Sequence, residues 1–301
     1  MKKRIAYLIG VLALVAFAYL FLKPQDYRVS FTINTFAGPI NQSIKLWHKD
    51  HKKGVELSQQ SLYELTQTLK FNDSVHTYHW KITPENDSVS RVDVDILDKK
   101  NRLSNRLAVL TGNTPVIRRS KRELLDFAKK LNDHIQSFRV HSFEEVEMPA
   151  TYYAYVTIEG SLRGKARGMM QNLPYLSAFL LENKVDLNGS PFIEVLDWNQ
   201  AKDSITYNFC YPVLRSERLP NHSEIKFKRF FDKKALKVEY NGNYINSDRA
   251  WYALLDYAKA NNIDVDPTPI EYFYNNPNMG GNELNWKAEI FLPIKEETVK
   301  F

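Results

Sequence analysis

The chain has 301 residues, 44% of them hydrophobic, and a formal net charge of +6 at pH 7. This composition argues against disorder and is typical of a globular protein with room for two domains after a short leader. The single cysteine, Cys210, excludes an intramolecular disulfide, and the basic run at 118–122 indicates a solvated helix face, because a nucleic-acid surface needs a broader basic stripe.

Residues 5–22 form an uncharged and almost wholly apolar segment that follows three basic residues. Eighteen residues are just enough to span a bilayer, and basic residues before the span keep the N-terminus in the cytoplasm. The segment therefore predicts a single-pass anchor over residues 1–24 in the inner membrane of a bacterium, with the rest of the chain on the periplasmic side. A signal peptide cleaved at Ala16-Phe17-Ala18 is the alternative, but cleavage there would leave the apolar run 19–22 exposed.

Strand patterns dominate the next hundred residues. Apolar and polar residues alternate over 27–33, and a short helix-like stretch follows Gly38-Pro39. Residues 50–70 are polar and carry no clear pattern. Asn-Asp and Lys-Lys-Asn turn signals then separate three further strand candidates, at 75–82, 89–97 and 103–111, which predict an antiparallel meander.

A long helix is predicted to begin at Thr114-Pro115, with threonine as the cap and proline at the first helical position. Its apolar residues form one stripe suited to lie across a sheet: Leu124, Ala128, Leu131, Ile135 and Phe138. The order of strand, helix, strands and long helix over residues 27–139 resembles the helix-grip fold of the START-like (SRPBCC, polyketide-cyclase-like) superfamily. The resemblance implies a START-like domain over residues 25–142.

A second pattern occurs twice in the last 150 residues. In each copy an apolar run ends at a glycine, Gly160 or Gly242, and a helix-like stretch and two strands follow. Ile193-Glu194 and Ile270-Glu271 stand at corresponding places. The copies predict a duplicated strand-helix-strand-strand unit with pseudo-twofold symmetry, whose seam can hold a ligand. The predicted strands are 151–159, 191–198 and 204–213 in the first copy, and 235–241, 269–275 and 286–294 in the second.

The second copy carries the motifs of a known family. They are Tyr240-Asn-Gly242-Asn-Tyr244, Trp251 with Leu254, Pro269-Ile-Glu271-Tyr272, Trp286-Lys-Ala-Glu289-Ile290 and Pro293-Ile294. In order and spacing, residues 143–296 resemble the GyrI-like domain, the small-molecule-binding module also found as the effector-binding domain of AraC-type and BmrR-type transcription regulators. Pro174, which interrupts the first helix, departs from the family pattern, and a DNA-binding helix-turn-helix is absent. The predicted fold is therefore α+β: a transmembrane helix, a START-like domain and a GyrI-like domain over 143–301.

Glu271 is the first candidate for a ligand contact. A carboxylate on an otherwise apolar strand is costly to bury unless a positive charge offsets its own, and a cationic aromatic ligand would supply that charge. The resemblance agrees, since GyrI-like pockets present glutamate among aromatic residues to drug-like cations. A nearby arginine or lysine is the structural alternative for Glu271 and for the second candidate, Glu289. Glu194, which corresponds to Glu271 in the first copy, ranks third.

Aromatic residues complete the candidate site, because rings at the seam would provide stacking and cation–π contacts. They are Tyr153, Tyr155, Tyr244, Tyr272 and Trp286, together with Trp251, whose place on the helix stripe is more typical of a core residue. Histidine pairs at 48/51 and 76/79 lack ligand geometry, and phosphate loops and nucleophile motifs are missing, so neither a metal nor a cofactor is predicted. The expected partners are a small hydrophobic or cationic ligand and the membrane, and no nucleic acid is expected.

Three functions stay open from the sequence. The leading one is a membrane-anchored protein that senses or sequesters an aromatic or cationic small molecule in the GyrI-like half. The second is a hydrolase of reactive electrophilic molecules, in which Glu271 acts as a general acid or base. The third is a protein-interaction module without a ligand.

Overall fold

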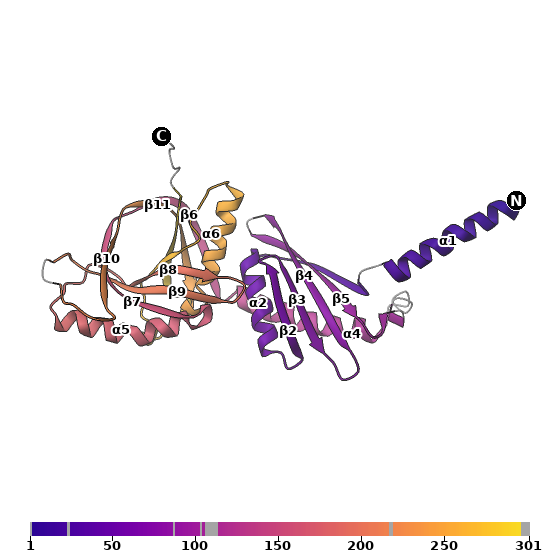
Figure 1. The fold of residues 1–301 in the computed structure, drawn as a ribbon, viewed down its shortest axis with the longest axis horizontal. Helices are drawn as coiled ribbons and strands as arrows, with labels where there is room; N and C mark the ends of the chain where they lie inside the picture. The colour runs from indigo at the N-terminus through magenta and orange to yellow at the C-terminus, as the bar shows by residue number, and fades with distance from the viewer. Residues whose placement is uncertain are drawn as a thin grey trace. The chain divides into compact units, whose positions relative to one another are not determined.

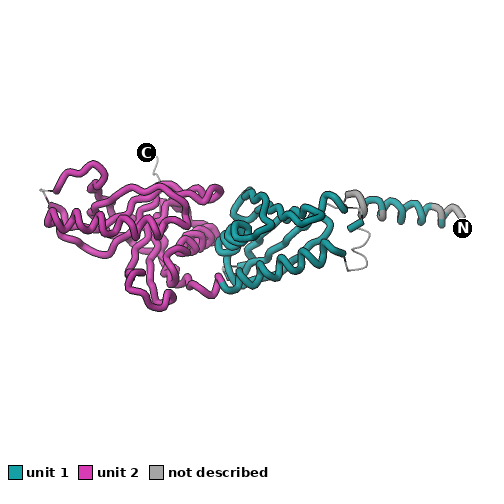
Figure 2. Tube along the Cα trace, turned by 90° about the horizontal axis from the view of Figure 1, so that it is seen from below, with its two compact units in different colours: residues 1–133 teal, residues 134–301 magenta. Residues whose placement is uncertain are grey.

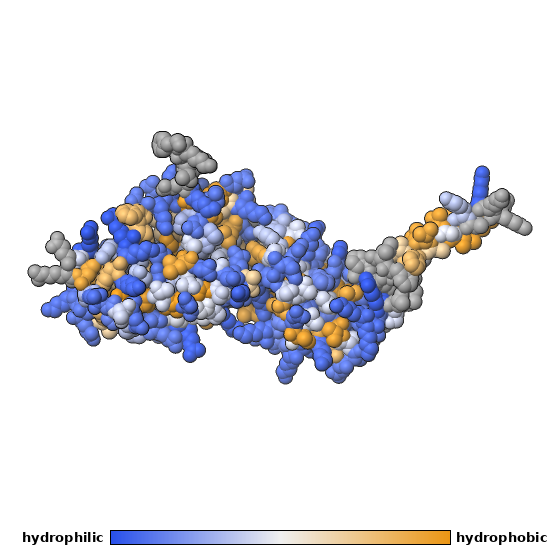
Figure 3. Space-filling model, in the orientation of Figure 1, coloured by the Kyte–Doolittle hydropathy of each residue, from blue (hydrophilic) through white to orange (hydrophobic). Residues whose placement is uncertain are grey.

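The computed structural model describes residues 2–22, 25–86, 88–102, 104–105, 114–216 and 219–295. The chain divides into two compact units, residues 1–133 and 134–301 (Figure 2). Helix α1 (Lys2–Leu22) begins the chain and carries many exposed apolar side chains (Figure 3). Among the described residues, no helix has the length and apolar character needed to cross a membrane.

The first unit is a five-stranded antiparallel sheet that packs against two helices. Its strands follow the order β1-β5-β4-β3-β2. The rings of Trp47, Trp80 and Phe127 meet at the centre, with centroids 6.3 Å apart for the two tryptophans, 5.5 Å for Trp47 and Phe127, and 4.8 Å for Trp80 and Phe127. The elements are β1 (Tyr27–Ile33), α2 (Ala37–Asp50), β2 (Gly54–Ser61), β3 (Glu64–Lys70), β4 (Val75–Asn86), β5 (Val89–Asp98) and α4 (Pro115–Ile135).

Most elements predicted for this unit are confirmed. The strand at 27–33, the helix after it, the strands near 75–82 and 89–97 and the long helix all form. Thr114 caps that helix, because its Oγ1 accepts a hydrogen bond of 3.2 Å from the backbone N–H of Ile117. The strand predicted at 103–111 lies almost entirely outside the described residues, and the two that are described, 104 and 105, are helical. The START-like assignment of this unit stays a prediction.

Strands β2 and β3 lie where the sequence carried no clear pattern. Gln67 is buried on β3 between Leu65 and Leu69, at a position where alternation leads one to expect an apolar residue. Its Oε1 accepts a hydrogen bond of 3.1 Å from the indole N–H of Trp80, which satisfies a polar group that is otherwise costly to bury. The partner is distant in sequence, so the pattern of β3 alone does not reveal it.

The second unit is built on an eight-stranded antiparallel sheet (Figure 1). The order across the sheet is β10-β7-β9-β8-β12-β13-β11-β6. From the centre of the sheet outward, one half runs β8-β9-β7 and the other runs β12-β13-β11. In each half the outermost of these strands comes first in the chain, and a helix follows it. The elements are β6 (Phe138–Met148), β7 (Thr151–Ser161), α5 (Lys165–Glu182), β8 (Phe192–Asn199), β9 (Ser204–Pro212), β10 (Lys226–Phe230), β11 (Lys233–Gly242), α6 (Asp248–Ala260), β12 (Ile270–Phe273) and β13 (Lys287–Pro293).

The predicted strands and helices of the two copies form, with three local differences. Gly160 pairs with Ile205 inside β7 instead of making a turn. Pro174 lies within a continuous α5 and does not interrupt it. Two strands were not predicted: β6 crosses the domain boundary predicted between residues 142 and 143, and β10 lies between the two predicted copies. Both occupy sheet edges and expose much of their length, so neither shows the apolar alternation of a central strand.

The strand register decides which side chains share a face. Glu271 pairs with Ile193, and Glu194 pairs with Ile270. Paired residues lie on the same face of a sheet and neighbours along a strand lie on opposite faces, so Glu194 and Glu271 are on opposite sides. The prediction that Glu194 and Glu271 occupy corresponding places in the two copies is therefore wrong, because the two side chains are offset by one residue along the paired strands. Helices α5 and α6 cover the Glu271 face, and the other face carries a core cluster of Met148, Tyr153, Phe192, Cys210, Phe230, Ala235 and Ile270.

Candidate ligand pocket

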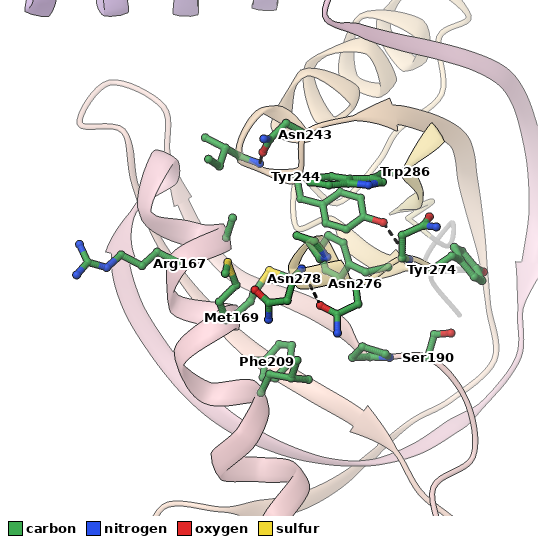
Figure 4. A pocket seen from close by; sticks show the side chains of 18 of the residues that line it. Arg167, Met169, Ser190, Phe209, Asn243, Tyr244, Tyr274, Asn276, Asn278 and Trp286 are labelled. Carbon is green, nitrogen blue, oxygen red and sulfur yellow. Dashed lines mark hydrogen bonds between the residues drawn. The ribbon is translucent and has the colours of Figure 1, made fainter. Parts of the chain in front are cut away.

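A cavity of about 410 Å³ lies on the helix-covered face of the second unit (Figure 4). The first half of α5 forms one wall, and the short helix η2 (Tyr244–Asn246) with the segment after β12 forms the other. In Figure 4 the rings of Tyr244 and Trp286 lie together at one end, and Phe209 lies at the other. The described lining residues are Arg163, Ala166, Arg167, Met169, Met170, Leu173, Ser190, Pro191, Phe209, Tyr211, Asn243, Tyr244, Ile245, Phe273, Tyr274, Asn275, Asn276, Pro277, Asn278 and Trp286.

Tyr244 presents a fixed ring to the cavity. Its hydroxyl donates a hydrogen bond of 2.8 Å to the carbonyl of Lys287 and accepts one of 3.1 Å from the N–H of Asn275. Its ring centroid lies 4.9 Å from that of Phe273 and 5.8 Å from that of Trp286. Burial raises the pKa of Tyr244 to about 12, so the phenol stays neutral at physiological pH. The aromatic wall is therefore preformed and uncharged.

Four asparagines line the cavity beside this wall. The Oδ1 atom of Asn275 accepts a hydrogen bond of 2.8 Å from the N–H of Lys287, and that of Asn276 accepts one of 3.0 Å from the N–H of Asn278. These bonds orient the two amides, and each retains an NH₂ group that can donate to a ligand. Asn243 uses both ends of its amide, since its Oδ1 accepts from the N–H of Ile245 and its Nδ2 donates to Glu283.

Glu271 lies behind the pocket and is fully buried. Its Oε2 accepts a hydrogen bond of 2.7 Å from the ammonium of Lys165, which is also fully buried, and one of 3.3 Å from the indole N–H of Trp251. Its Oε1 has no hydrogen-bond partner among the described residues. Glu271 therefore has the lysine partner that the sequence left open as the alternative to a cationic ligand, and it is not one of the described residues that line the cavity.

Lys165 is held by three groups. Besides Glu271, its ammonium donates a hydrogen bond of 2.5 Å to the hydroxyl of Ser247 and lies 4.6 Å from the ring centroid of Trp251. The Ser247 hydroxyl in turn donates to the carbonyl of Tyr244 at 2.9 Å. Ser247 stands at the N-terminus of α6, but its side chain makes no cap hydrogen bond with that helix and instead links the ion pair to the pocket wall.

Glu194 lies on the opposite face of the sheet. It accepts hydrogen bonds from the hydroxyl of Tyr153 at 2.8 Å, from Asn208 at 2.9 Å and from Lys228 at 3.0 Å. Burial opposes its ionisation, but the bonds from Asn208, Lys228 and Tyr153 outweigh burial and hold the pKa of Glu194 below its ordinary value. Burial also raises the pKa of Tyr153 well above its usual range. Tyr155 packs beside this group, with its ring centroid 5.9 Å from that of Tyr153.

Glu289 and Tyr272 line a second cavity, of about 650 Å³, which is bordered by β7, the end of β9 and β13. Glu289 accepts a hydrogen bond of 2.6 Å from the hydroxyl of Tyr274 and pairs with Lys287 at 3.2 Å. Partial burial opposes its ionisation, but these contacts outweigh it and lower the pKa of Glu289. The face of β13 that carries Glu289 is half-exposed, whereas Ala288 and Ile290 on the other face of that strand are fully buried.

The structure thus separates the predicted site residues into four places. Tyr244 and Trp286 line the first cavity, Glu271 and Trp251 lie behind it, Tyr272 and Glu289 line the second cavity, and Tyr153, Tyr155 and Glu194 lie on the face away from the helices. The sequence analysis missed Lys165, Met169, Phe209 and the asparagines at 275, 276 and 278. Alternation in β9 identifies Phe209 as buried on one face, but no local signal marks Lys165 as buried, because its partners are 82 and 106 residues away.

Metal binding has no support in the described part of the chain, where no group of three or more His, Cys, Asp or Glu side chains is placed to hold an ion. The cavity instead offers rings, sulfur-containing and apolar side chains, and a few amide donors. Such a surface can bind an aromatic or apolar molecule by stacking and burial and can orient it through a small number of hydrogen bonds.

Comparison with known proteins gives a family match over the second unit. Residues 141–295 match the family described as GyrI-like small molecule binding domain. A search of curated proteins finds no match. Similar solved structures include the EcmrR C-terminal domain, with 15% identity and a TM-score of 0.45, covering 52% of this chain and 98% of that one.

Two further solved structures are similar to part of the chain. SAV2435 bound to tetraphenylphosphonium has 9% identity and a TM-score of 0.36, and the match covers 52% of this chain and 94% of that one. A hydrolase from Listeria innocua has 12% identity and a TM-score of 0.35, with 51% of this chain and 92% of that one covered.

Proposed function

Because the chain belongs to the GyrI-like small molecule binding domain family, we propose that it binds a small molecule in the 410 Å³ cavity between α5 and the segment after β12. The observation that carries the proposal is the preformed aromatic wall. The ring of Tyr244 contacts both Phe273 and Trp286, and its hydroxyl makes two hydrogen bonds to backbone groups. A wall that is rigid before binding lowers the entropic cost of holding a flat ligand.

Native mass spectrometry of the full chain, purified gently from its own host, tests the proposal. A small molecule that copurifies with the protein at one-to-one stoichiometry supports binding. Addition of the same molecule must also raise the melting temperature, because a ligand that binds only the folded state stabilises it by about 2.7 kcal/mol at a concentration of 100 Kd. A protein that carries nothing and gains no thermal stability from a library of aromatic compounds would contradict the proposal.

A pair of aromatic substitutions locates the binding site. Trp286→Ala removes a ring that lines the cavity, and we expect it to weaken binding roughly tenfold, since one stacked ring contributes about 0.5–1.5 kcal/mol beyond the area it buries. Phe231→Ala is the matched control, because Phe231 is 69% exposed and is not among the lining residues. Equal affinities for the two variants would place the ligand elsewhere.

The membrane anchor over residues 1–24 and the location on the periplasmic side of an inner membrane stay predictions. They depend on the uncharged run at 5–22. Fractionation of cells that express the full chain, followed by protease treatment of intact spheroplasts, tests both: recovery in the soluble fraction would contradict the anchor, and protection from the protease would contradict the periplasmic side.

A further inference from the structure

We infer that the pocket selects an uncharged aromatic molecule with hydrogen-bond acceptors and disfavours organic cations, because Lys165 already neutralises Glu271, the fully buried glutamate behind it. The inference rests on the proposed function and names its ligand class. A neutral ligand here replaces the cationic ligand that Glu271 led us to expect from the sequence.

The chain supplies its own cation to Glu271. The two side chains are both fully buried, and the ammonium of Lys165 lies 2.7 Å from Oε2 of Glu271. The same ammonium lies 4.6 Å from the ring centroid of Trp251, where a bound organic cation would otherwise gain a cation–π contact. The Glu271 carboxylate and the Trp251 ring are therefore both occupied by Lys165.

Access to the carboxylate is also closed. Glu271 and Lys165 are not among the described residues that line the cavity, whereas their neighbours Phe273 and Ala166 are. The hydroxyl of Ser247 accepts from Lys165 and donates to the carbonyl of Tyr244, so the ion pair is fastened to the back of the aromatic wall. Because Glu271 has no exposed surface, a ligand cation would reach it only after the side chains that cover it had moved.

The described residues that face the cavity carry no negative charge. The charged ones among them are Arg163 and Arg167, both exposed, and Figure 4 shows the Arg167 side chain directed away from the cavity. A cation that entered would lose its hydration without meeting a carboxylate, which is unfavourable. The amides of Asn275 and Asn276 are oriented by their Oδ1 contacts and offer NH₂ donors, which favour a carbonyl, ether or oxide oxygen on the ligand.

Two aryl-phosphorus probes that differ in charge test the inference on the full chain by isothermal titration calorimetry. They are triphenylphosphine oxide, which is neutral and carries an oxygen acceptor, and the tetraphenylphosphonium cation. We expect the oxide to bind at least tenfold more tightly (about 1.4 kcal/mol) and Trp286→Ala to weaken its binding. A phosphonium ion that binds as tightly as the oxide overturns this inference and leaves the proposed function standing. Failure of both probes at millimolar concentration also overturns the inference, and the copurification experiment then decides the proposed function by itself.

Asn276→Asp adds a negative charge to the pocket without removing a structural contact. An aspartate keeps the oxygen that accepts from the N–H of Asn278, and aspartate and asparagine are equally good caps. We expect this variant to bind the phosphonium ion roughly tenfold more tightly than the unmodified chain and the oxide more weakly. An unchanged preference for the oxide over the cation would overturn the inference.

The double variant Lys165→Met with Glu271→Gln tests the internal counter-ion. It removes both charges together and keeps the volumes similar, so it avoids leaving one buried charge alone. We expect it to retain the preference for the oxide, because neither charge is presented to the ligand. A loss of oxide binding with the melting temperature kept would show that the ion pair contacts the ligand and would overturn the inference.

Discussion

Glu271 and Glu194, two glutamates that the sequence marks as ligand contacts, lie on opposite faces of the sheet in the second unit and are neutralised differently. On the helix-covered face, Glu271 has one buried lysine, one indole donor and one oxygen without a partner among the described residues. On the other face, Glu194 has three hydrogen-bond donors, and the side chain of its lysine, Lys228, is 45% exposed.

The two ion pairs differ in their access to solvent. A buried pair without access to water depends on each partner to offset the charge of the other, so removing one charge leaves the other stranded. A pair that is open to water loses little when the lysine is removed, because water and the remaining donors solvate the carboxylate. The Glu271 face therefore contains a rigid internal salt bridge, whereas the Glu194 face contains an adaptable polar cluster.

The largest expected effect comes from breaking the pair on the helix-covered face. Lys165→Met leaves Glu271 buried without a counter-ion, and we expect it to lower the free energy of unfolding of the second unit by about 3–5 kcal/mol. Hydrogen exchange of peptides from α5 and β12 in increasing denaturant measures the change. Adding Glu271→Gln to this variant serves as the control and should restore much of the loss; a double variant as unstable as the single one would contradict the comparison.

A smaller effect is expected from removing the carboxylate on the other face. Glu194→Gln weakens three charge-assisted hydrogen bonds but keeps an oxygen acceptor at the same place. We expect the free energy of unfolding to fall by about 1.5–3 kcal/mol, because a hydrogen bond to a charged group contributes about that much. The neutral glutamine oxygen retains part of the contribution of the other bonds. The same exchange measurement on β8 and β9 peptides tests the value, and a loss larger than that of Lys165→Met would reverse the comparison.

The stability of this cluster should also depend on pH. The folded pKa of Glu194 lies below its ordinary value of 4.5, so its stabilising contribution is present above that value and is lost as the pH falls through the folded pKa. We expect the unmodified chain to lose stability more steeply than Glu194→Gln as the pH is lowered below about 4.5. Parallel pH profiles for the two proteins would show that Glu194 does not titrate in this way.

The smallest effect is expected for Lys228→Met. This substitution matches Lys165→Met in chemistry, but it removes a lysine whose side chain is 45% exposed. Exposed ion pairs contribute about 0.2–1 kcal/mol, so the free energy of unfolding should change by less than about 1 kcal/mol. A change as large as that of Lys165→Met would show that water does not replace Lys228 beside Glu194.

The sequence predicted most elements of both units because their signals are local. Alternation identified β4 and β5, and the Thr114-Pro115 signature fixed the start of α4 to the residue. Elements whose signals depend on distant partners were missed. Gln67 on β3 is satisfied by Trp80, and β6 is stabilised at the sheet edge by pairing with β11.

In the candidate site, too, residues with local sequence signals were predicted, and relations between distant segments were not. The family motifs identified Tyr244 and Trp286, and both line the cavity. The assignment of Glu194 and Glu271 to matching places failed because similar sequence letters do not fix the register between two strands, and a shift of one residue moves a side chain to the other face.

By itself, the sequence determined the order of strands and helices, the family of the second half and the aromatic character of the pocket, because periodicity, caps and motifs act over a few residues. Only the tertiary structure decided that Glu271 is neutralised by Lys165 and that the described residues facing the cavity carry no carboxylate. The physical reason is that the charge of a buried group depends on neighbours brought from 82 and 106 residues away, and such neighbours leave no trace in the local pattern.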